Sequence, residues 1–315
     1  MMIAHNGTND SCTTYLSNFP SATLSFSFGL LNAANSVTAT VENSIALFIM
    51  LWYRELHSIS DRIFISLIIT DLFAGLTAAP LHAAQLLSKE ISYNCRVEEV
   101  RRSLAALLIG VSALTVATIS YDRYLHLTKL NNYYKYMTKR KAAVLIIFAW
   151  VVPALLPTLR MSAETELPYN IAFPALMIII FITLIVFYAL ILCSLKRRSA
   201  WRESSPRLEK RQLQTMKTVI TIITCFVVMG LPVILPVILM PLNIDKETMS
   251  AIYVPALTLN MLNSSANPVI YYYRSPNIRR CAKKLFRLDT RRNHSPQTLR
   301  QARQSVTSSS TTYQV

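Results

Sequence analysis

Charged residues are scarce in this sequence, which has 15% Asp, Glu, Lys and Arg against 52% hydrophobic residues. A soluble domain usually carries about 25% charge, so a water-facing globule is not expected. Five cysteines in 315 residues exclude a scaffold held by many disulfides. Five glycines leave little for a phosphate-binding loop, and no Gly-x-Ser-x-Gly, His-x-x-x-His or Cys-x-x-Cys pattern indicates an enzyme. The class that remains is a membrane protein.

Seven apolar runs have the length of about 20 residues that crosses a bilayer as a helix. They lack the alternating polarity of a membrane β-barrel, so we predict an all-α membrane protein, a seven-transmembrane helix bundle. The two halves of the chain show no internal repeat, which weakens the alternative of a transporter or channel. The predicted spans are Phe26–Leu51, Ile63–Leu87, Leu104–Leu127, Ala142–Leu159, Ile171–Leu195, Met216–Met240 and Ala251–Tyr273.

The distribution of Lys and Arg between the loops predicts the orientation of the chain. With the N-terminus outside, only six of the 32 basic residues face outward and the other 26 face inward. The net charge of +16 is therefore a topology signal, and nucleic-acid binding has no further support. We expect a multi-pass protein of the plasma membrane. The six outward residues are Lys89, Arg96, Arg101, Arg102, Arg160 and Lys246.

The spans divide the chain into four parts, of which residues 26–273 form the seven-transmembrane domain. Residues 1–25 are predicted to be an extracellular N-terminus without a cleavable signal peptide, and Asn6 and Asn9 begin N-glycosylation sequons. Residues 274–288 predict a short amphipathic helix on the inner membrane surface, where Cys281 either carries palmitate or is unmodified. Residues 289–315 are polar and predict a disordered cytoplasmic tail.

Asp71 is the sharpest polar feature inside a predicted span, because it follows Leu67-Ile-Ile-Thr in an apolar run. A polar group in a bilayer needs partners, and Asn43, Ser112 and residues of the seventh run are candidates. Two interpretations follow from these residues. They form either a hydrogen-bonded cluster that fastens helices, or an ion or proton site in the middle of the bundle.

Together these features resemble the rhodopsin-like, or class A, G-protein-coupled receptors. The resemblance rests on motifs that occur in order and in the matching spans. The motif residues are Asn43, Leu67-x-x-x-Asp71, Asp122-Arg123-Tyr124, Trp150, Tyr188, Phe226 with Pro232, and Asn267-Pro268-Val269-Ile270-Tyr271. The family implies helix-packing roles for Asn43, Trp150, Phe226, Pro232 and Pro268.

The resemblance also implies how the chain signals. Arg123 would pair with Asp122 at rest and reach a heterotrimeric G protein when released, while Tyr188 and Tyr271 would hold the open form. No cofactor is expected apart from an allosteric Na⁺. The hydroxyl run that ends at Thr312 would bind arrestin once phosphorylated, and Tyr313-Gln314-Val315 weakly resembles a PDZ-binding end. The implied sodium pocket, with Asp71 as the metal ligand, consists of Asp71, Ser112, Asn263, Ser264 and Asn267.

Several positions depart from the family pattern. Glu98 replaces the cysteine at the outer end of the third span, so the usual disulfide cannot form; Cys12 and Cys95 either pair instead or remain free thiols. Gly230 replaces a tryptophan of the sixth span, which predicts a wider and wetter sodium pocket. Gln212 replaces the acid that locks the arginine.

Glu42-Asn43, the missing proline at Ile180 and the cysteine-free second outer loop resemble the melanocortin, cannabinoid and lysophospholipid receptor branch. The implied ligand is a lipid-like or peptide molecule. Ala105 replaces the aspartate of amine receptors, and Met261 replaces the retinal lysine of opsins. The third span begins with a charged rim that either contacts a ligand head group or snorkels to the interface. This rim consists of Glu98, Glu99, Arg101 and Arg102.

Overall fold

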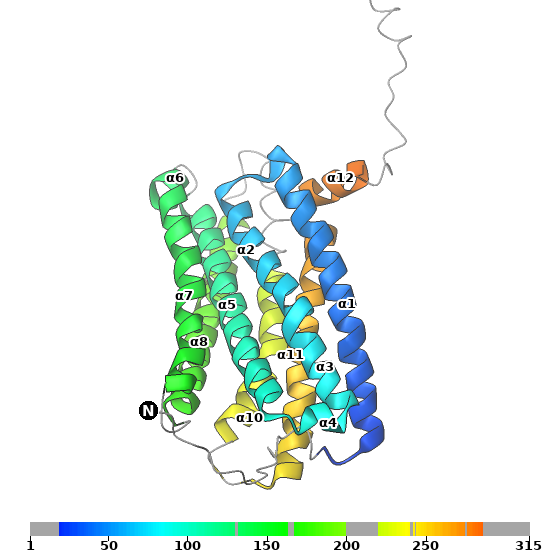
Figure 1. Cartoon of the computed structure of the whole chain (residues 1–315). Helices are drawn as coiled ribbons and strands as arrows, with labels where there is room; N and C mark the ends of the chain where they lie inside the picture. Colours follow the sequence, from blue (N-terminus) through cyan, green and yellow to red (C-terminus); the bar gives the residue numbers. More distant parts are fainter. Residues whose placement is uncertain are drawn as a thin grey trace, which may run out of the picture.

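The structure is a computed structural model that describes residues 19–129, 132–162, 167–199, 220–239, 242, 244–274 and 276–285. Within these ranges every regular element is a helix. Figure 1 shows long helices running side by side in one elongated bundle, with a short helix lying across one end. The fold class predicted from the apolar runs, an all-α seven-helix bundle, is confirmed.

The first three spans are long helices joined by short connections. The first span is α1 (Ala22–Trp52), and the third is α5 (Cys95–Thr128). The second span consists of α2 (Ile59–Phe73), the π-helical turn η3 (Ala74–Ala78) and α3 (Ala79–Leu87). The connections contain the 3-10 turn η2 (Arg54–Leu56) and the short helix α4 (Lys89–Ser92).

The fourth and fifth spans are α7 (Lys139–Ser162) and α8 (Leu167–Ser199), and α6 (Tyr133–Tyr136) precedes α7. The sixth span is helical from Ile220, tightens to the 3-10 turn η5 (Leu231–Val233) at Pro232, and continues as α10 (Ile234–Leu239). The seventh span is α11 (Lys246–Arg274), which is followed by α12 (Pro276–Leu285).

Five of these stretches are long and apolar enough to cross a membrane by length and composition alone. The stretch Ile220–Pro236 is shorter, and α11 carries several Asn and Ser residues among its apolar ones. Several helices, among them α7 and α8, extend about one turn past the predicted spans, whereas the described part of the sixth span lies within its predicted bounds. The largest difference is at α5, which begins nine residues before Leu104. The first turns of α5 are polar, and the Asn94 side chain caps them by accepting hydrogen bonds from the amides of Arg96 and Val97.

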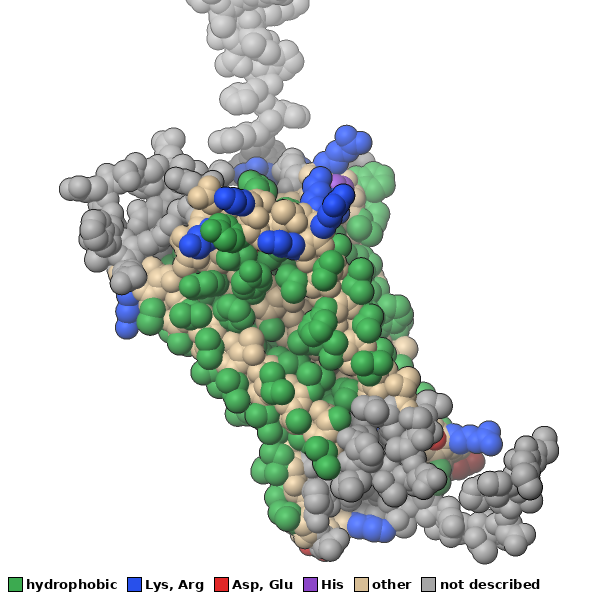
Figure 2. Space-filling model, turned by 90° about the vertical axis from the view of Figure 1, so that its left-hand side faces the viewer, with side chains coloured by type: hydrophobic (Ala, Val, Ile, Leu, Met, Phe, Trp, Pro, Cys, Tyr) green, Lys and Arg blue, Asp and Glu red, His purple; other side chains and the backbone are tan. Residues whose placement is uncertain are grey.

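The two ends of the bundle differ in charge. Lys and Arg side chains gather at one end of the face seen in Figure 2, beyond a broad hydrophobic band. This end carries η2, α6 and α12, and we call it the α12 end; the opposite end, with α4 and the start of α11, is the α4 end (Figure 1). The asymmetry agrees with the uneven distribution of Lys and Arg between the loops of the sequence.

The hydrophobic residues divide between an interior and an exposed belt. The interior packs around α5, which touches α2, α7 and α8. Val37, Val144 and Ile179 are more than half exposed, as are other large apolar residues on α1, α7 and α8. A soluble protein rarely exposes so continuous an apolar surface, whereas a bilayer accepts it.

An amphipathic helix is expected after the seventh span, and α12 confirms it. Its apolar face, however, does not contact the membrane surface as expected. Cys281 and Ala282 are buried in the main core, and Ile278 packs against it. The apolar face therefore lies on the bundle rather than on lipid. Of the two alternatives for Cys281, this burial favours the unmodified thiol, because an acyl chain would require α12 to move away from the bundle.

Candidate functional site

Asp122 and Arg123 lie at the α12 end of α5, where both side chains are buried. The Arg123 Nε lies 3.4 Å from the Asp122 Oδ2, which is an ion pair rather than a hydrogen bond. Ser60 of α2 donates a hydrogen bond to the same carboxylate at 2.8 Å, and the Tyr133 hydroxyl of α6 donates another at 2.6 Å. The carboxylate that faces Arg123 is thus fixed from three elements.

Tyr133 remains a neutral donor in this arrangement. Its burial, together with the neighbouring Asp122 carboxylate, raises the pKa of the Tyr133 phenol well above its ordinary value. The His126 ring stacks on Tyr133 with centroids 3.6 Å apart, and the His126 Nδ1 lies 3.7 Å from the Asp122 Oδ2. α6 is therefore joined to α5 by both a hydrogen bond and ring packing.

Arg123 also contacts an aromatic pair that leads to the seventh span. Its guanidinium carbon lies 5.7 Å from the centre of the Phe64 ring, and Phe64 packs edge-on against Tyr271 at 5.3 Å. The Tyr271 hydroxyl is buried, and no hydrogen-bond partner for it occurs among the described residues. Tyr124 packs beside Phe187 at 6.2 Å, and Tyr188 is half-buried against the main core.

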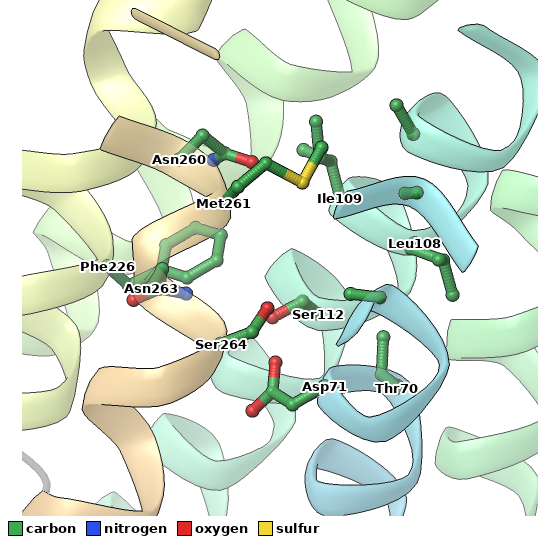
Figure 3. A pocket seen from close by; sticks show the side chains of 13 residues that line it. Thr70, Asp71, Leu108, Ile109, Ser112, Phe226, Asn260, Met261, Asn263 and Ser264 are labelled. Carbon is green, nitrogen blue, oxygen red and sulfur yellow. The ribbon is translucent and has the colours of Figure 1, made fainter. Parts of the chain in front are cut away.

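Asp71 lies in the middle of the bundle beside a small cavity of about 20 Å³ (Figure 3). Asn267 donates a hydrogen bond to its Oδ2 at 2.8 Å. Ser112, Asn263 and Ser264 line the same cavity, and in Figure 3 the hydroxyls of Ser112 and Ser264 point toward one another beside Asp71. The structure thus brings together all five residues of the predicted sodium pocket.

The donor set of this cavity fits a hard cation. Among the described residues the Ser112 Oγ and the Asn263 Oδ1 are buried without a hydrogen-bond partner. Carboxylate, hydroxyl and amide oxygens are the ligands that hard cations prefer, and a cavity of this size also has room for a water molecule. No group of three or more His, Cys, Asp and Glu side chains occurs in the described part of the chain, so a transition-metal site is not indicated there.

The predicted packing residues make specific contacts. The Asn43 side chain donates to the Ala39 carbonyl at 2.8 Å and to the Ser264 carbonyl at 3.0 Å, which joins α1 to α11. The Trp150 indole donates to the Ser66 hydroxyl at 3.0 Å. Phe226 is buried beside the cavity, Pro232 is the middle residue of the 3-10 turn η5, and Pro268 lies inside α11.

Gly230 lies close to an aromatic ring of the fifth span. A Cβ atom at Gly230 would lie 3.3 Å from the Phe181 ring, which packs against Phe226 with centroids 5.9 Å apart. The space near Gly230 is therefore filled by the rings of the fifth and sixth spans. Whether the sodium pocket is wider and wetter than in other members of the family stays a prediction.

The charged rim of the third span divides into two parts, so neither ligand contact nor snorkelling to the interface describes all four residues. Glu99 is exposed and Arg102 is half-buried, but Arg101 is fully buried and Glu98 is 7% exposed. The Arg101 Nη2 donates to both Glu98 oxygens at 2.7 and 2.8 Å, and its Nη1 donates to the Tyr253 hydroxyl at 3.2 Å. Gln85 donates to the Glu98 Oε2 at 3.1 Å, so the pair joins α3, α5 and α11.

Sequence reasoning missed several polar contacts between spans. Asn32 donates to the Thr258 hydroxyl at 2.9 Å, and Asn35 donates to the Met261 carbonyl at 2.9 Å. With Ala39 and Asn43, these residues recur on one buried stripe of α1, and that spacing was a usable signal. No local pattern indicated Ser60 or Tyr133. Both bind Asp122 from another helix, and Ser60 is 62 residues and Tyr133 is 11 residues away from it in the sequence.

Some predicted residues lie outside the described part of the chain. These include both sequons, Cys12, Gln212 and the whole tail, so glycosylation, the Cys12–Cys95 pairing and the tail interactions stay predictions. Cys95 itself is exposed at the start of α5.

The geometry defines a bundle of long apolar helices with a buried acid–arginine pair at one end. The sequence matches the family described as 7 transmembrane receptor (rhodopsin family) over residues 42–170 and 161–271. The chain therefore belongs to the rhodopsin family of seven-transmembrane receptors, the class A G-protein-coupled receptors, as its motifs predict.

Sequence identity to individual proteins is low, whereas the similarity of fold is high. The chain is 24% identical over 263 residues to the lysophosphatidic acid receptor 3 of Rattus norvegicus, which covers 77% of this chain and 73% of that receptor. A shorter match to the histamine H2 receptor of Cavia porcellus has 32% identity over 99 residues, which covers 31% of this chain and 28% of that receptor. The crystal structure of squid rhodopsin superposes with a TM-score of 0.76 at 16% identity, covering 89% of this chain and 91% of that one.

Proposed function

We propose that this receptor transmits an extracellular signal to a heterotrimeric G protein at its α12 end. The observation that carries the proposal is the buried Asp122–Arg123 pair, which Ser60 and Tyr133 hold in place. Among the described residues the Arg123 Nε makes this ion pair but no hydrogen bond, so a G protein that offers a better-aligned acceptor could replace the Asp122 contact. The basic α12 end would face the cytoplasm, and the N-terminus would be extracellular.

The proposed mechanism is a shift between two packings of the same bundle. At rest Asp122 holds Arg123 over the Phe64 ring, and Tyr271 packs on the other side of Phe64. A ligand at the α4 end would favour a form in which Arg123 leaves Asp122 and the Tyr188 and Tyr271 hydroxyls find new partners. A ligand produces this shift only by binding the second form more tightly.

Nucleotide exchange on a G protein tests this function directly. Cells that express the receptor with a promiscuous G-protein reporter would be screened with a ligand panel, and hits repeated on Arg123→Ala at equal surface expression. We expect a ligand that signals through the wild type and fails to signal through Arg123→Ala. A matched variant, Lys135→Ala, changes a basic residue of α6 and should keep the signal. Solute flux or current without nucleotide exchange would instead indicate a transporter or channel.

We propose a lipid-like or peptide ligand rather than an amine. Ala105, which stands where the amine receptors have their aspartate, is buried and offers an ammonium group only a methyl group. Among the described residues Asp71 is the only carboxylate that lines the cavity next to Ala105, and the proposal assigns it to Na⁺. The relatives include histamine receptors by name. A panel with lysophospholipids, peptides and biogenic amines at equal concentrations tests this, and a submicromolar amine response would overturn it.

The internal pairing of Arg101 also restricts which ligand head groups can bind. Its guanidinium already donates to Glu98 and Tyr253, so an anionic head group would have to displace the Glu98 carboxylate. Among lipid-like ligands, those with a neutral or zwitterionic head group should therefore bind better than simple monoanions. Glu98→Gln would reverse this order if the carboxylate is what excludes an anion.

Three further interactions complete the proposal. Na⁺ would bind at Asp71 in the resting form, held by the oxygens of Ser112, Asn263 and Ser264 near the Asn267 amide.

Phosphorylation of the hydroxyl run that ends at Thr312 would create an anionic strip for arrestin, because each phosphate adds about −1.5 to −2 charge. Alanine at every hydroxyl of residues 307–312 should slow agonist-driven internalisation, and unchanged uptake would contradict it. The end Tyr313-Gln314-Val315 would add to the sheet edge of a PDZ domain.

A further inference from the structure

A histidine lies beside the Asp122–Arg123 pair, and the proposed mechanism does not use it. The His126 Nδ1 lies 3.2 Å from the Asp122 backbone carbonyl oxygen and 3.7 Å from the Asp122 Oδ2. The His126 side chain is 33% exposed, whereas the Asp122 side chain is 1% exposed. Water at the α12 end therefore reaches the imidazole more readily than it reaches the carboxylate.

His126 and Arg123 face the same oxygen of the Asp122 side chain. The Arg123 Nε lies 3.4 Å from the Oδ2 that is 3.7 Å from the His126 Nδ1. Arg123 and Asp122 both interact electrostatically with the imidazole. A carboxylate attracts a protonated imidazole and a guanidinium repels it, so a charged His126 would compete with Arg123 for one partner.

The other groups packed around His126 do not supply a second charge in the described structure. From α6, Tyr133 stacks on the imidazole, and its burial together with the neighbouring carboxylate raises the pKa of the phenol, which stays neutral. From α2, Ser60 reaches the same carboxylate with a hydroxyl that does not titrate. Lys129, on the next turn of α5, places its Nζ 5.4 Å from the centre of the Tyr136 ring.

The balance between these charges differs between the two forms of the receptor. At rest Arg123 faces Asp122, so a proton on His126 would add a second cation beside a single carboxylate. In the signalling form Arg123 has left, and Asp122 attracts a charged His126 without competition. The signalling form therefore binds a proton at His126 more tightly than the resting form does. By linkage, a proton that binds there shifts the population toward the signalling form.

We propose that His126 is a positioning residue whose protonation displaces Arg123 from Asp122, so that acid at the α12 end raises ligand-free signalling. The inference rests on the proposed function, because it gives the Asp122–Arg123 pair a regulator, the proton of the compartment that the α12 end faces. An imidazole changes its charge between about pH 5 and pH 8. Signalling should therefore rise as the pH falls through this range.

Nucleotide exchange without ligand measures the consequence. The full-length receptor in nanodiscs is mixed with a purified G protein at about pH 6 and about pH 7.5, and each rate is divided by that of the G protein alone. We expect a rise of about threefold at the lower pH in wild type, the effect of one partly screened charge. His126→Phe keeps a ring on Tyr133 but takes up no proton, so it should lose this rise.

Two further variants separate charge from local damage. His126→Lys carries a permanent charge, so its rate should be high at both pH values. His57→Phe is the matched control, because His57 is an exposed histidine of the same end whose Nε2 lies 3.2 Å from the Leu51 carbonyl oxygen. It should keep the pH dependence of wild type. If His126→Lys does not fold, the comparison of wild type with His126→Phe decides the result.

A second measurement needs no G protein. Histidine NMR of the isotope-labelled receptor follows the titration of His126, whose signal is identified by its loss in His126→Phe. Arg123→Ala removes the repelling charge and should raise the titration midpoint by about half a pH unit, a threefold change in proton affinity. Asp122→Asn should lower the midpoint. Lys135→Ala, which removes an exposed cation of α6, should leave it unchanged.

Three outcomes would overturn the proposal. A rate in wild type that does not change with pH would show that no proton acts on the pair. Equal pH dependence in wild type and His126→Phe would assign the proton to another group, such as Asp122 itself. An equal midpoint in wild type and Arg123→Ala would show that His126 and Arg123 are not coupled. If the receptor activates no G protein at any pH, the proposed function fails, and the NMR titration still decides whether the two residues are coupled.

Discussion

The Arg101 guanidinium lies against the Glu98 carboxylate with 2.7 Å between Nη2 and Oε1, and both side chains are buried at the α4 end. Glu98 occupies the position where the family usually has a disulfide cysteine. Through Gln85 and Tyr253 the pair reaches α3 and α11, so a polar contact joins three spans where a covalent bond is absent. We infer that the pair stabilises the α4 end of the bundle.

Removing one member of the pair should destabilise the receptor more than removing both. Glu98→Leu leaves Arg101 buried without its counter-charge, a change that costs about 3–5 kcal/mol in soluble proteins. Glu98→Leu with Arg101→Met replaces the pair by apolar side chains and should recover most of that loss. The measurement is the melting temperature of the purified receptor in a double-mutant cycle.

Glu99→Leu is the matched control, because Glu99 is exposed one residue away on the same helix. It should leave the melting temperature within the range of an ordinary surface substitution, about 0.5 kcal/mol. Additive losses in the cycle, with no recovery in the double variant, would mean that Glu98 and Arg101 do not stabilise the bundle as a pair.

The Tyr133 hydroxyl should hold the receptor in its resting form. Tyr133→Phe removes the 2.6 Å hydrogen bond to the Asp122 carboxylate and keeps the ring that stacks on His126. A hydrogen bond to a charged group contributes about 1.5–3 kcal/mol. If its loss destabilises the resting form more than the active form by only part of this free energy, ligand-free nucleotide exchange should rise several-fold. Exchange on a purified G protein, at equal receptor number, is the measurement.

The neighbouring Tyr134 provides the control for this prediction. It is 75% exposed on the same short helix, so Tyr134→Phe should leave the ligand-free rate unchanged. A rate that rises equally in both variants would point to a general loosening of α6, and an unchanged rate in Tyr133→Phe would remove Tyr133 from the resting lock.

Gly110 should tolerate a methyl group less well than Gly230 does. A Cβ at Gly110 would lie 2.7 Å from the Pro153 Cβ, so Gly110→Ala must separate α5 from α7 and should cost about 1–3 kcal/mol. A Cβ at Gly230 would lie 3.3 Å from the end of the Phe181 ring, which can shift. Melting temperatures of the two alanine variants check the order, and a smaller loss at Gly110 would contradict it.

The sequence predicts the spans and the motif pairs well, because each depends on local patterns. Apolar runs locate the helices, and Asp122 and Arg123 are adjacent in the chain. The contacts that sequence reasoning missed depend on distant residues. The three-residue spacing of Glu98 and Arg101 in the sequence is compatible with an ion pair on one helix face. The sequence does not show that Arg101 is buried, because its other partner, Tyr253, comes from α11. Similarly, Cys281 was expected at the lipid surface because a helical stripe does not show which surface covers it.

Na⁺ should stabilise the receptor through Asp71. If the cation binds the folded resting form, stability rises with its concentration, by about 1.4 kcal/mol when the concentration is tenfold above the dissociation constant. We therefore expect a higher melting temperature in NaCl than in choline chloride at equal ionic strength. Ser112→Ala and Asn263→Ala should each weaken the dependence, because each removes an oxygen that is buried without a partner in the described structure.

Asp71→Asn should abolish the Na⁺ dependence and reduce agonist-driven signalling, because it removes the charge that opposes the cation while Asn267 stays nearby. Asp245→Asn is the matched control: this exposed residue accepts a hydrogen bond from the Thr248 amide at 2.8 Å, which an asparagine oxygen can also accept. By linkage, Na⁺ must then weaken agonist binding by the factor by which agonist weakens Na⁺ binding. Equal shifts with NaCl in wild type and Asp71→Asn would place the cation elsewhere, and the cavity beside Asp71 would then hold water alone.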